Sequence, residues 1–542
     1  MTADLQTLLE QALAEASADM APGEAEFTVP PDADHGDLST NAALVFGKKL
    51  GVKPRDLAGA IAEALKAAPD AAAVEVAGPG FVNVRLADEA IFAAASRALS
   101  EGDDYGRSDV GRGARVQVEF VSANPTGPLN AVNARAAAYG DALARLLEFT
   151  GHAAAREFYV CDVGTQMDLL AQSVRARMLE LRGEAAELPE GGYRGEYVVD
   201  LARQLSEAGA VSPGDDDGRI AAAAAEAVVA GQRADLGSFG VEFDEWFPES
   251  SLYPDAVARA RKLLAERAAT YEKDGATWLR TTAAGDDEDR VIVRADGRPT
   301  YFMADVAYHL DKHERGFTRV IDVLGPDHHG HVKKLHAMVE LLGLPADWLE
   351  VVICQQVNML EGGEKVKMSK RAGALVTMRE VLEQIGTDAA RFFFLMRTPP
   401  AHLDFDLELA RSQTPDNPVY YAQYCHARVE SVRREAGEDM ANASPQDFDA
   451  AELPLPEERL LARTIWEFPG FVEAAAARRE PHRLTAYAGR LASLFHNYYH
   501  HHRILQADTA GQARARLFLA RAVGRTMKNA LGLLGVSAPS RM

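Results

Sequence analysis

The sequence predicts a protein that is α/β over most of its length and all-α at its C-terminal end. Three observations indicate this fold class. Strand, loop, helix and strand signals follow one another between Val116 and Val160, which is how a doubly wound parallel sheet begins. Two β-type runs separated by Gly-Pro-Gly lie near the N-terminus. After Asp406 only helical periodicity remains, carried by Ala, Leu, Arg and aromatic residues.

The N-terminal part, residues 1–108, is expected to form a small α/β domain. Apolar residues from Leu5 to Ala16 recur at helical spacing, and further helices are expected at 41–49 and 54–67. The runs VEVA and FVNVRL within Val74–Leu86 predict a hairpin with a tight turn. A stretch rich in Gly, Asp and Arg at 102–113 predicts a linker to the next domain.

The central part, residues 109–405, is expected to contain the parallel sheet. We expect strands at 116–121, 156–160, 290–294 and 320–324, and a helix at 134–149. Between about 175 and 280 the chain is Ala-rich and mostly helical, which predicts an insertion into the sheet domain. Residues 406–542 form the predicted helical domain, and ligands of such sheets bind where strand ends meet helix N-termini.

The composition limits the classes of function. With 542 residues and a net charge of −22, several domains are expected, and the whole surface does not coat nucleic acid or membranes nonspecifically. From Pro481 to Met542, however, there are nine Arg or Lys and one acid, Asp508. This stretch is either a solvated helical face or a phosphate-binding face.

Cysteine usage and hydropathy indicate the compartment. Cys161, Cys354 and Cys425 are far apart and odd in number, which predicts reduced thiols in a cytoplasmic protein and no structural metal. The N-terminus has no apolar signal-peptide core, and no window approaches the ~18 apolar residues of a membrane span.

The most specific local signal is the run Lys367-Met368-Ser369-Lys370-Arg371, preceded by Gly362-Gly363. Two lysines on a mobile loop suit a polyphosphate that is gripped as it leaves, because such charge stabilises the transition state. The run resembles the KMSKS loop of class I aminoacyl-tRNA synthetases. This resemblance implies that Lys367 and Lys370 are catalytic and that residues 367–370 (Lys367, Met368, Ser369, Lys370) bind ATP.

A second signal stands at the first strand-to-helix turn, SANPTGPL from Ser122 followed by Asn130-Ala131-Val132-Asn133. It resembles the HIGH element of arginyl-tRNA synthetases, in which His-Val-Gly-His follows SANPTGPL. Asn130 and Asn133 occupy the two histidine positions, and the resemblance implies that they are catalytic. Both can still donate hydrogen bonds to ATP, but never carry charge. Val132 stands where the family's glycine leaves room for adenine, and its branched side chain fills that room.

Segments in family order extend the resemblance over about 500 residues. They are His35-Gly36-Asp37, Thr40 to Ala43, Ala77 to Asn83, YVCDVGTQM from Tyr159, Trp246 to Tyr253, Thr300 to Phe302, Gly325 to His331, Asn417 to Tyr421 and Leu533 to Met542. The arginyl family implies a class I, Rossmann-type sheet domain, a small N-terminal α/β domain and a C-terminal anticodon-binding helical bundle.

The resemblance also implies an arginine site. Carboxylates fit the planar fork of a guanidinium, and by resemblance Tyr301 and Asp305 line that pocket. Glu119, Ser122 and Asn124 would hold the amino and carboxylate ends of the substrate, with assistance from Asp327. From the residues alone, Asp305 could instead be an ordinary acid at the start of a helix.

Two further groups of residues keep two interpretations each. His328 and Gly330 lie in a strand-end loop that either contacts the nucleotide or contains ordinary structural histidines. Tyr420, Tyr421 and Tyr424 either pack in a helical core or stack on anticodon bases, an interaction worth ~1–3 kcal/mol per base. Asn41 and Met542 join them as tRNA-binding candidates by resemblance.

The family reaction defines the expected partners, which are ATP with Mg²⁺, L-arginine and tRNA(Arg), and we expect a monomer. The first hypothesis is therefore an arginine–tRNA ligase. The alternative is a synthetase-derived tRNA-binding or regulatory protein that activates arginine poorly, because the HIGH element reads Asn-Ala-Val-Asn. A synthetase-like ligase of small molecules is a third, weaker hypothesis, which the tRNA-binding flanks oppose.

Overall fold

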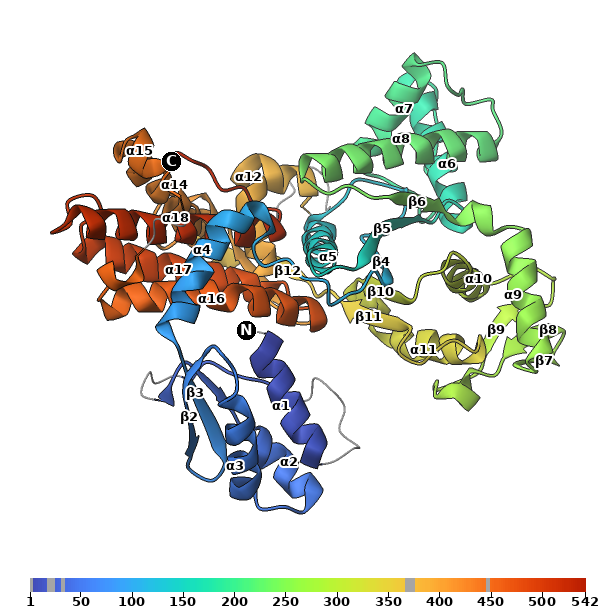
Figure 1. Ribbon diagram of the computed structural model, residues 1–542. Coiled ribbons are helices and arrows are strands. Elements are labelled where there is room, and N and C mark those ends of the chain that lie inside the picture. Colours follow the sequence, from blue (N-terminus) through green and yellow to red (C-terminus); the bar gives the residue numbers. More distant parts are fainter. Residues whose placement is uncertain (1–2, 17–24, 31–34, 366–375, 445–448) are drawn as a thin grey trace.

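The structure, a computed structural model, describes residues 3–16, 25–30, 35–365, 376–444 and 449–542. The N-terminal unit packs α1 (Ala3–Ala16), α2 (Ala42–Leu50) and α3 (Pro54–Leu65) against an antiparallel sheet of order β1-β3-β2 (Figure 1). The strands are β1 (Leu38–Thr40), β2 (Ala71–Ala77) and β3 (Phe81–Leu86). The predicted hairpin is confirmed, since β2 and β3 pair antiparallel; β1 was not predicted.

Helix α4 (Asp88–Glu101) leaves this unit and packs along the C-terminal helices α16 (Pro456–Ala477) and α18 (Ala510–Leu533). The short 3₁₀ helix η2 (Gly102–Asp104) follows within the predicted linker. Asn529 of α18 fastens this segment, because its amide donates to the carbonyl oxygens of Gly102 and Tyr105. The predicted limits of the three domains, at 108/109 and 405/406, stay predictions.

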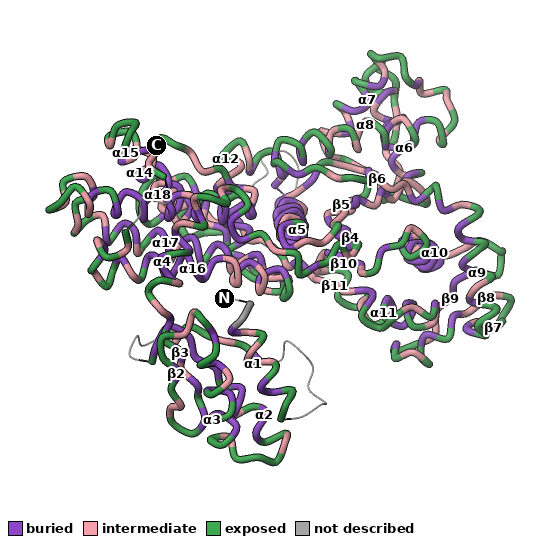
Figure 2. The backbone as a smooth tube through the Cα atoms, in the orientation of Figure 1, coloured by how far each residue is buried: buried purple, intermediate pink, exposed green. Residues whose placement is uncertain are grey.

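The centre of the molecule is a five-stranded parallel sheet of order β11-β10-β4-β5-β6. Its strands are β4 (Arg115–Phe120), β5 (Ala153–Val160), β6 (Glu245–Pro248), β10 (Arg319–Leu324) and β11 (Leu349–Ile353). Helix α5 (Ala131–Phe149) lies buried against the sheet (Figure 2). Gly140 permits this approach, because a Cβ there would overlap the Phe120 ring. The predicted strands at 116–121, 156–160 and 320–324 and the helix at 134–149 are confirmed.

A helical insertion projects from the sheet between β5 and β6 (Figure 1). It consists of α6 (Thr165–Leu181), α7 (Glu196–Glu207) and α8 (Asp217–Ser238). These helices have their own apolar core, which includes Leu170, Val198 and Ile220. Strand β6 lies inside the range predicted as an insertion, yet it pairs with β5 of the main sheet. Its four residues, EWFP, were too short to signal a strand.

The prediction that residues 290–294 rejoin the main sheet is wrong. Strand β9 (Arg290–Val293) pairs antiparallel with β8 (Ala276–Leu279), which pairs with β7 (Thr270–Lys273) in a separate sheet. Helix α9 (Asp255–Glu266) precedes this sheet, and α10 (Tyr301–Glu314) follows it. The apolar run RVIV signals a strand but carries no information about its partner.

The rest of the chain is mostly helical. Strands β12 (Val357–Glu361), β13 (Glu364–Lys365) and β14 (Leu403–Asp406) form a small sheet beside α12 (Met378–Leu395), and α11 (Val332–Leu341) precedes β11. The predicted all-α region after Asp406 is confirmed: it contains α13 (Leu407–Arg411), α14 (Pro418–Glu435), α15 (Glu438–Ala441), α16, α17 (His482–His501) and α18.

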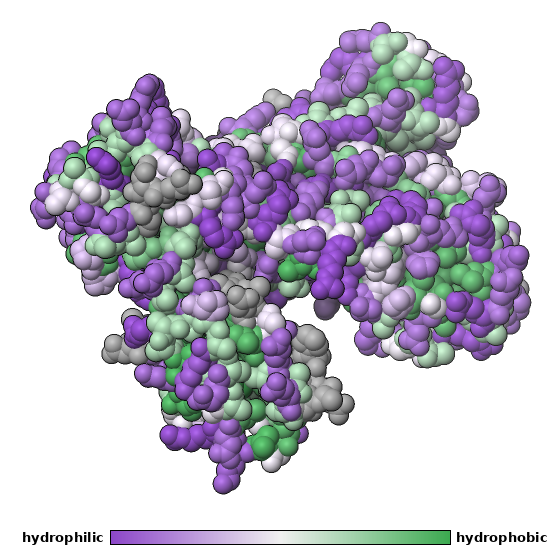
Figure 3. All heavy atoms as spheres, in the orientation of Figure 1, coloured by the Kyte–Doolittle hydropathy of each residue, from purple (hydrophilic) through white to green (hydrophobic). Residues whose placement is uncertain are grey.

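The surface is largely polar. Figure 3 shows hydrophilic side chains over most of the face that it displays, interrupted by small apolar areas. Of the helices that the structure describes, none is long and apolar enough to cross a membrane.

Candidate active site

Three buried carboxylates lie side by side across the parallel sheet. Glu119 on β4 is in register with Asp322 on β10 and with Glu157 on β5. Lys312 of α10 joins two of them, since its Nζ lies 2.6 Å from Glu119 Oε2 and 2.8 Å from Asp322 Oδ1. Glu157 accepts from the Tyr308 hydroxyl. These three carboxylates and Lys312 therefore form a buried ionic cluster beneath the carboxyl ends of the strands.

The charges of this ionic cluster stabilise one another. Burial alone would raise the pKa of Asp322, but the Lys312 ammonium and a hydrogen bond from His309 hold it well below its usual range. Burial alone would lower the pKa of Lys312, yet Asp322 and Glu119 raise it above its usual value. Asp322 and Lys312 are therefore both charged at neutral pH.

Replacing Lys312 by Met is expected to lower the free energy of unfolding by about 3–5 kcal/mol, because Glu119 and Asp322 would remain as buried, unneutralised charges. Denaturant unfolding measures this difference. Lys262→Met on α9 is the matched control, since that side chain is 77% exposed, and its change is expected to stay within about 0.5 kcal/mol. Equal effects of the two substitutions would contradict the role of Lys312 in neutralising the buried carboxylates.

The backbone turns sharply where β4 ends. Val121 and Ser122 have φ values of 70° and 38°, a region that non-glycine residues rarely adopt. The turn directs the Ser122 hydroxyl to Glu119 Oε1 at 2.8 Å, and Ser122 Oγ in turn accepts from the Tyr159 amide at 3.1 Å. Asn124 is exposed and donates to Gln166 of α6 at 2.7 Å. Glu119 and Ser122, both predicted for the arginine site, are thus in contact.

A second pair of carboxylates, Asp305 and Glu249, lies nearby. Burial raises the pKa of Asp305 to about 6; the Lys334 ammonium acts against this rise, and the charges of Glu249 and Glu119 add to it. Burial likewise raises the pKa of Glu249, whose Oε1 accepts from the Tyr253 hydroxyl at 3.4 Å. Among the described residues, neither carboxylate forms an ion pair. Such a pair suits a planar cation that brings its own charge.

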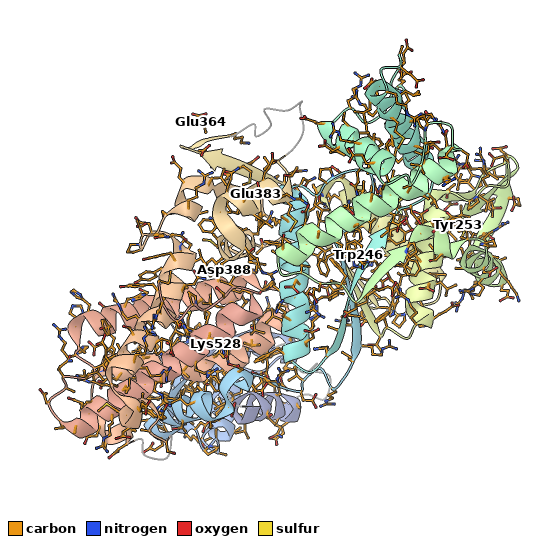
Figure 4. The ribbon with its side chains drawn as sticks, turned by 90° about the horizontal axis from the view of Figure 1, so that it is seen from above. Trp246, Tyr253, Glu364, Glu383, Asp388 and Lys528 are labelled. Atoms are coloured by element: carbon orange, nitrogen blue, oxygen red, sulfur yellow. The ribbon has the colours of Figure 1, made fainter. Side chains whose placement is uncertain are left out.

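Tyr253 and Tyr301 lie near these carboxylates. Tyr301, the first residue of α10, is 53% exposed, and its hydroxyl lies over Gly164, where a Cβ would be 2.5 Å away. Tyr253 follows β6 and is labelled in Figure 4 together with Trp246 of that strand. From the sequence, Glu249 was assigned no role. Its place in the family-like segment Trp246 to Tyr253 was a signal that could have identified it, since the strand before it, EWFP, is too short to be recognised from sequence.

The turn before α5 is organised by its two asparagines. Asn130 is the N-cap, and its Oδ1 accepts from the amides of Val132 (2.9 Å) and Asn133 (3.1 Å). In return Asn133 Oδ1 accepts from the Asn130 amide at 3.0 Å, which completes a capping box. Val132 is partly buried at the second helical position. Both side-chain oxygens are therefore engaged by the backbone, and the two Nδ2 groups are the donors that remain.

The same turn is joined to the start of α12. The Ala131 amide donates to the Val376 carbonyl oxygen at 3.1 Å, and the Met378 amide donates to that of Leu129 at 2.8 Å. Asn130 and Thr377 form an antiparallel bridge between them. Lys367, Met368, Ser369 and Lys370 lie outside the described residues. The segment that directly follows their loop is nevertheless fastened to the asparagine turn.

The histidine loop follows the carboxyl end of β10. It forms the 3₁₀ helix η5 (Pro326–His331), in which Asp327, His328 and Gly330 are exposed. The His328 and His331 rings lie 5.1 Å apart, and burial lowers the pKa of both residues. No hydrogen bond among the described residues ties Asp327 to Asp305 or Glu119. The loop shares the sheet edge with the pocket, and the roles of its residues remain predictions.

The predicted tRNA-binding residues fall in two places. On α14 the Tyr420 and Tyr424 rings stack at 5.9 Å, and Tyr421 packs on His496 at 4.5 Å. Tyr420 and Met542 line one cavity of about 490 Å³. Asn41 is the N-cap of α2, in the separate N-terminal unit (Figure 1).

No group of three or more His, Cys, Asp or Glu within the described ranges is arranged to hold a metal ion.

Three family models match the chain. The arginyl tRNA synthetase N terminal domain matches residues 3–86, and the catalytic domain of tRNA synthetases class I (R) matches residues 95–190 and 232–393. The DALR anticodon binding domain matches residues 422–542. The three matches together span nearly the whole chain, in the order of the three predicted domains.

Similar proteins align over nearly the whole chain. The arginine–tRNA ligase of Syntrophotalea carbinolica is 46% identical over 96% of this chain and 95% of its own length. That of Symbiobacterium thermophilum is 44% identical over 99% of both chains. Among solved structures, Thermus thermophilus arginyl-tRNA synthetase has the same fold, with a TM-score of 0.80, 23% identity and 99% of each chain covered.

Proposed function

This chain belongs to the arginyl-tRNA synthetase family, and we propose that it binds its substrates along the carboxyl edge of the parallel sheet, with Asn130 and Asn133 in place of two histidines. The chain is an arginine–tRNA ligase, with ATP, arginine and tRNA as substrates. The arginine carboxylate attacks the α-phosphorus of ATP and releases pyrophosphate. The terminal ribose hydroxyl of tRNA then accepts the arginyl group.

The observation that carries this proposal is the buried pair Asp305 and Glu249, neither of which forms an ion pair among the described residues. Two buried acids without ion-pair partners are unfavourable neighbours until a guanidinium arrives between them. Tyr301 borders the pocket and restricts it to a flat group. Glu119, held by Lys312 and Ser122, faces the other end of the substrate. We assign the amino and carboxylate ends of arginine to Glu119, Ser122 and Asn124, with Asp327 as an outer contributor.

Arginine binding should depend on pH in one direction. The raised pKa of Asp305, about 6, means that its carboxyl becomes neutral as the pH falls through that value, and a neutral acid no longer attracts guanidinium. The ratio kcat/KM for arginine should therefore fall about tenfold per pH unit below pH 6. Initial rates of arginine-dependent ATP–pyrophosphate exchange from about pH 5 to pH 8 measure this. A profile without a bend near pH 6 would contradict the role of Asp305.

We assign the turn before α5 to the binding of ATP, which would bind as its Mg²⁺ complex. The helix N-terminus favours phosphate, and the Nδ2 groups of Asn130 and Asn133 add two neutral donors. Val132 occupies space beside the expected adenine. Lys367, Met368, Ser369 and Lys370 are proposed to supply the cationic contacts, because the segment after their loop is bonded to this turn. His328 and Gly330 are proposed to border the nucleotide from the end of β10.

Aminoacylation of purified tRNA(Arg) with labelled arginine tests the proposal. We expect multiple turnovers that depend on ATP and Mg²⁺. Charging that stops below one arginyl-tRNA per protein molecule would instead support the alternative, a tRNA-binding protein with an impaired nucleotide turn.

The tRNA contacts, the oligomeric state and the cellular compartment of the protein are further proposals. Tyr420 and Met542 share a cavity, so we assign an anticodon base to it, with Tyr421 and Tyr424 behind, and assign Asn41 to the outer corner of tRNA. We also propose a cytoplasmic monomer. Its three cysteines are unpaired in the structure, which fits a reducing compartment.

A further inference from the structure

The turn between β4 and α5 is held from outside the sheet by the helical insertion. Gln232 of α8 is 1% exposed, and its Nε2 donates to two carbonyl oxygens of the turn, those of Asn124 (3.1 Å) and Gly127 (2.9 Å). Tyr197 of α7 donates its hydroxyl to the carbonyl oxygen of Thr126 at 2.9 Å. Side chains of the insertion thus donate hydrogen bonds to three carbonyl groups within the four residues 124–127.

The same helix also holds the start of α12. Oδ1 of Asp235, three residues after Gln232, accepts from Nε (2.9 Å) and Nη2 (2.6 Å) of Arg379. Arg379 is the second residue of α12 and stands two positions after Thr377. The Thr387 hydroxyl donates to the carbonyl oxygen of Ser238, at the end of α8. In Figures 1 and 4 α8 runs from the projecting insertion back to α12.

These bonds close a circuit around the nucleotide turn. It passes from Gln232 to the Asn124–Gly127 segment, on to Asn130, across the Asn130–Thr377 bridge, and back through Arg379 to Asp235. A closed circuit holds its members at fixed separations more firmly than any one bond does. The distance between the turn and the beginning of α12 therefore depends on where α8 lies.

We propose that Gln232 and Asp235 are positioning residues for arginine activation, through which α8 sets the separation of the asparagine turn from the segment after the Lys367–Arg371 loop. This inference rests on the proposed ATP site. Neither residue touches substrate; each acts through backbone that does. A displacement of about 1 Å in such an element can cost on the order of 100-fold in rate. Any ligand that shifts the projecting helices would consequently change the activation rate.

The test uses the full-length chain with tRNA(Arg), arginine and ATP in pyrophosphate exchange. Gln232→Met keeps the length of the side chain and removes the donor, so the carbonyl groups of Asn124 and Gly127 lose it. We expect kcat to fall about 10- to 100-fold and the KM for ATP to rise severalfold. The KM for arginine should rise less than that for ATP, because Asn124 is the one proposed arginine contact that Gln232 holds. A purely structural role would alter both KM values together or neither.

Three further variants keep the test decisive. Asp235→Asn retains an acceptor for Arg379 and should lose less activity than Asp235→Ala, which removes it. Glu226→Gln, an exposed position on the same helix, is the control and should match the parent chain. If the parent chain exchanges while Gln232→Met and Asp235→Ala keep its kcat and KM for ATP, the positioning role is wrong. If the parent chain itself fails to exchange, the proposed function fails instead.

Discussion

Replacing Asn130 by Asp is expected to leave the fold intact and to slow arginine activation by about 1000-fold or more. Loss of one preorganised donor to a developing charge costs ~2.7–4 kcal/mol. Aspartate also places a negative charge at the N-terminus of α5, where the triphosphate is proposed to bind. The cap itself survives, because an aspartate oxygen can still accept from the amides of Val132 and Asn133. Exchange kinetics and denaturant unfolding measure the two properties separately.

Asn130→Ser is the matched control for charge. Serine caps helices about as well as asparagine, so its stability should match the parent chain, while its hydroxyl replaces the amide donor without adding charge. We expect the rates to fall in the order Asn, Ser, Asp at nearly constant stability. If Asn130→Asp were as active as the parent chain, phosphate would not approach this turn.

Replacing Asp305 by Asn is expected to raise the KM for arginine by 100- to 1000-fold. Truncating one partner of a desolvated charge pair costs about 2–5 kcal/mol, and each 1.4 kcal/mol corresponds to about a factor of ten. The KM for ATP should stay close to that of the parent chain, since Asp305 lies under the amino-acid pocket. Saturation curves for arginine and for ATP, measured by pyrophosphate exchange, give both constants.

Asp311→Asn provides the comparison on the same helix. Asp311 pairs with Arg315, away from Glu249, so its replacement removes an acid of α10 without touching the pocket. Its KM for arginine should remain within about twofold of the parent value, consistent with the small effects of substitutions away from such features. An equal rise for both variants would mean that the charge of α10, not the contact at Asp305, attracts arginine.

The sequence predicted those parts of the fold that local patterns encode. The alternation in FVNVRL and the apolar run of β4 each specify a strand, and the helical spacing after Asp406 specifies the bundle. Pairing is not local, and this is why RVIV was assigned to the wrong sheet and EWFP was missed. Both strands are four residues long, so tertiary contacts decide their partners.

The residues of the candidate site were likewise predicted only in part. Glu119, Ser122, Asp305 and Tyr301 were predicted by resemblance, and the structure gathers them at one sheet edge. Glu249 was missed because its significance lies in a neighbour 56 positions away in sequence, Asp305 (305 − 249 = 56). The sequence also could not show that the two asparagines cap α5 through each other's backbone amides, since a capping box depends on where the helix begins.

The most direct test of the account is ATP–pyrophosphate exchange by the unaltered chain, with arginine, in the presence and absence of tRNA(Arg). If Asn130 and Asn133 serve as neutral donors in a working nucleotide site, exchange will be well above background and will require arginine. Restoring the family pattern, Asn130→His with Val132→Gly and Asn133→His, should then raise the rate little. Background exchange by the unaltered chain, recovered in that triple variant, would contradict the account and place the defect in this turn.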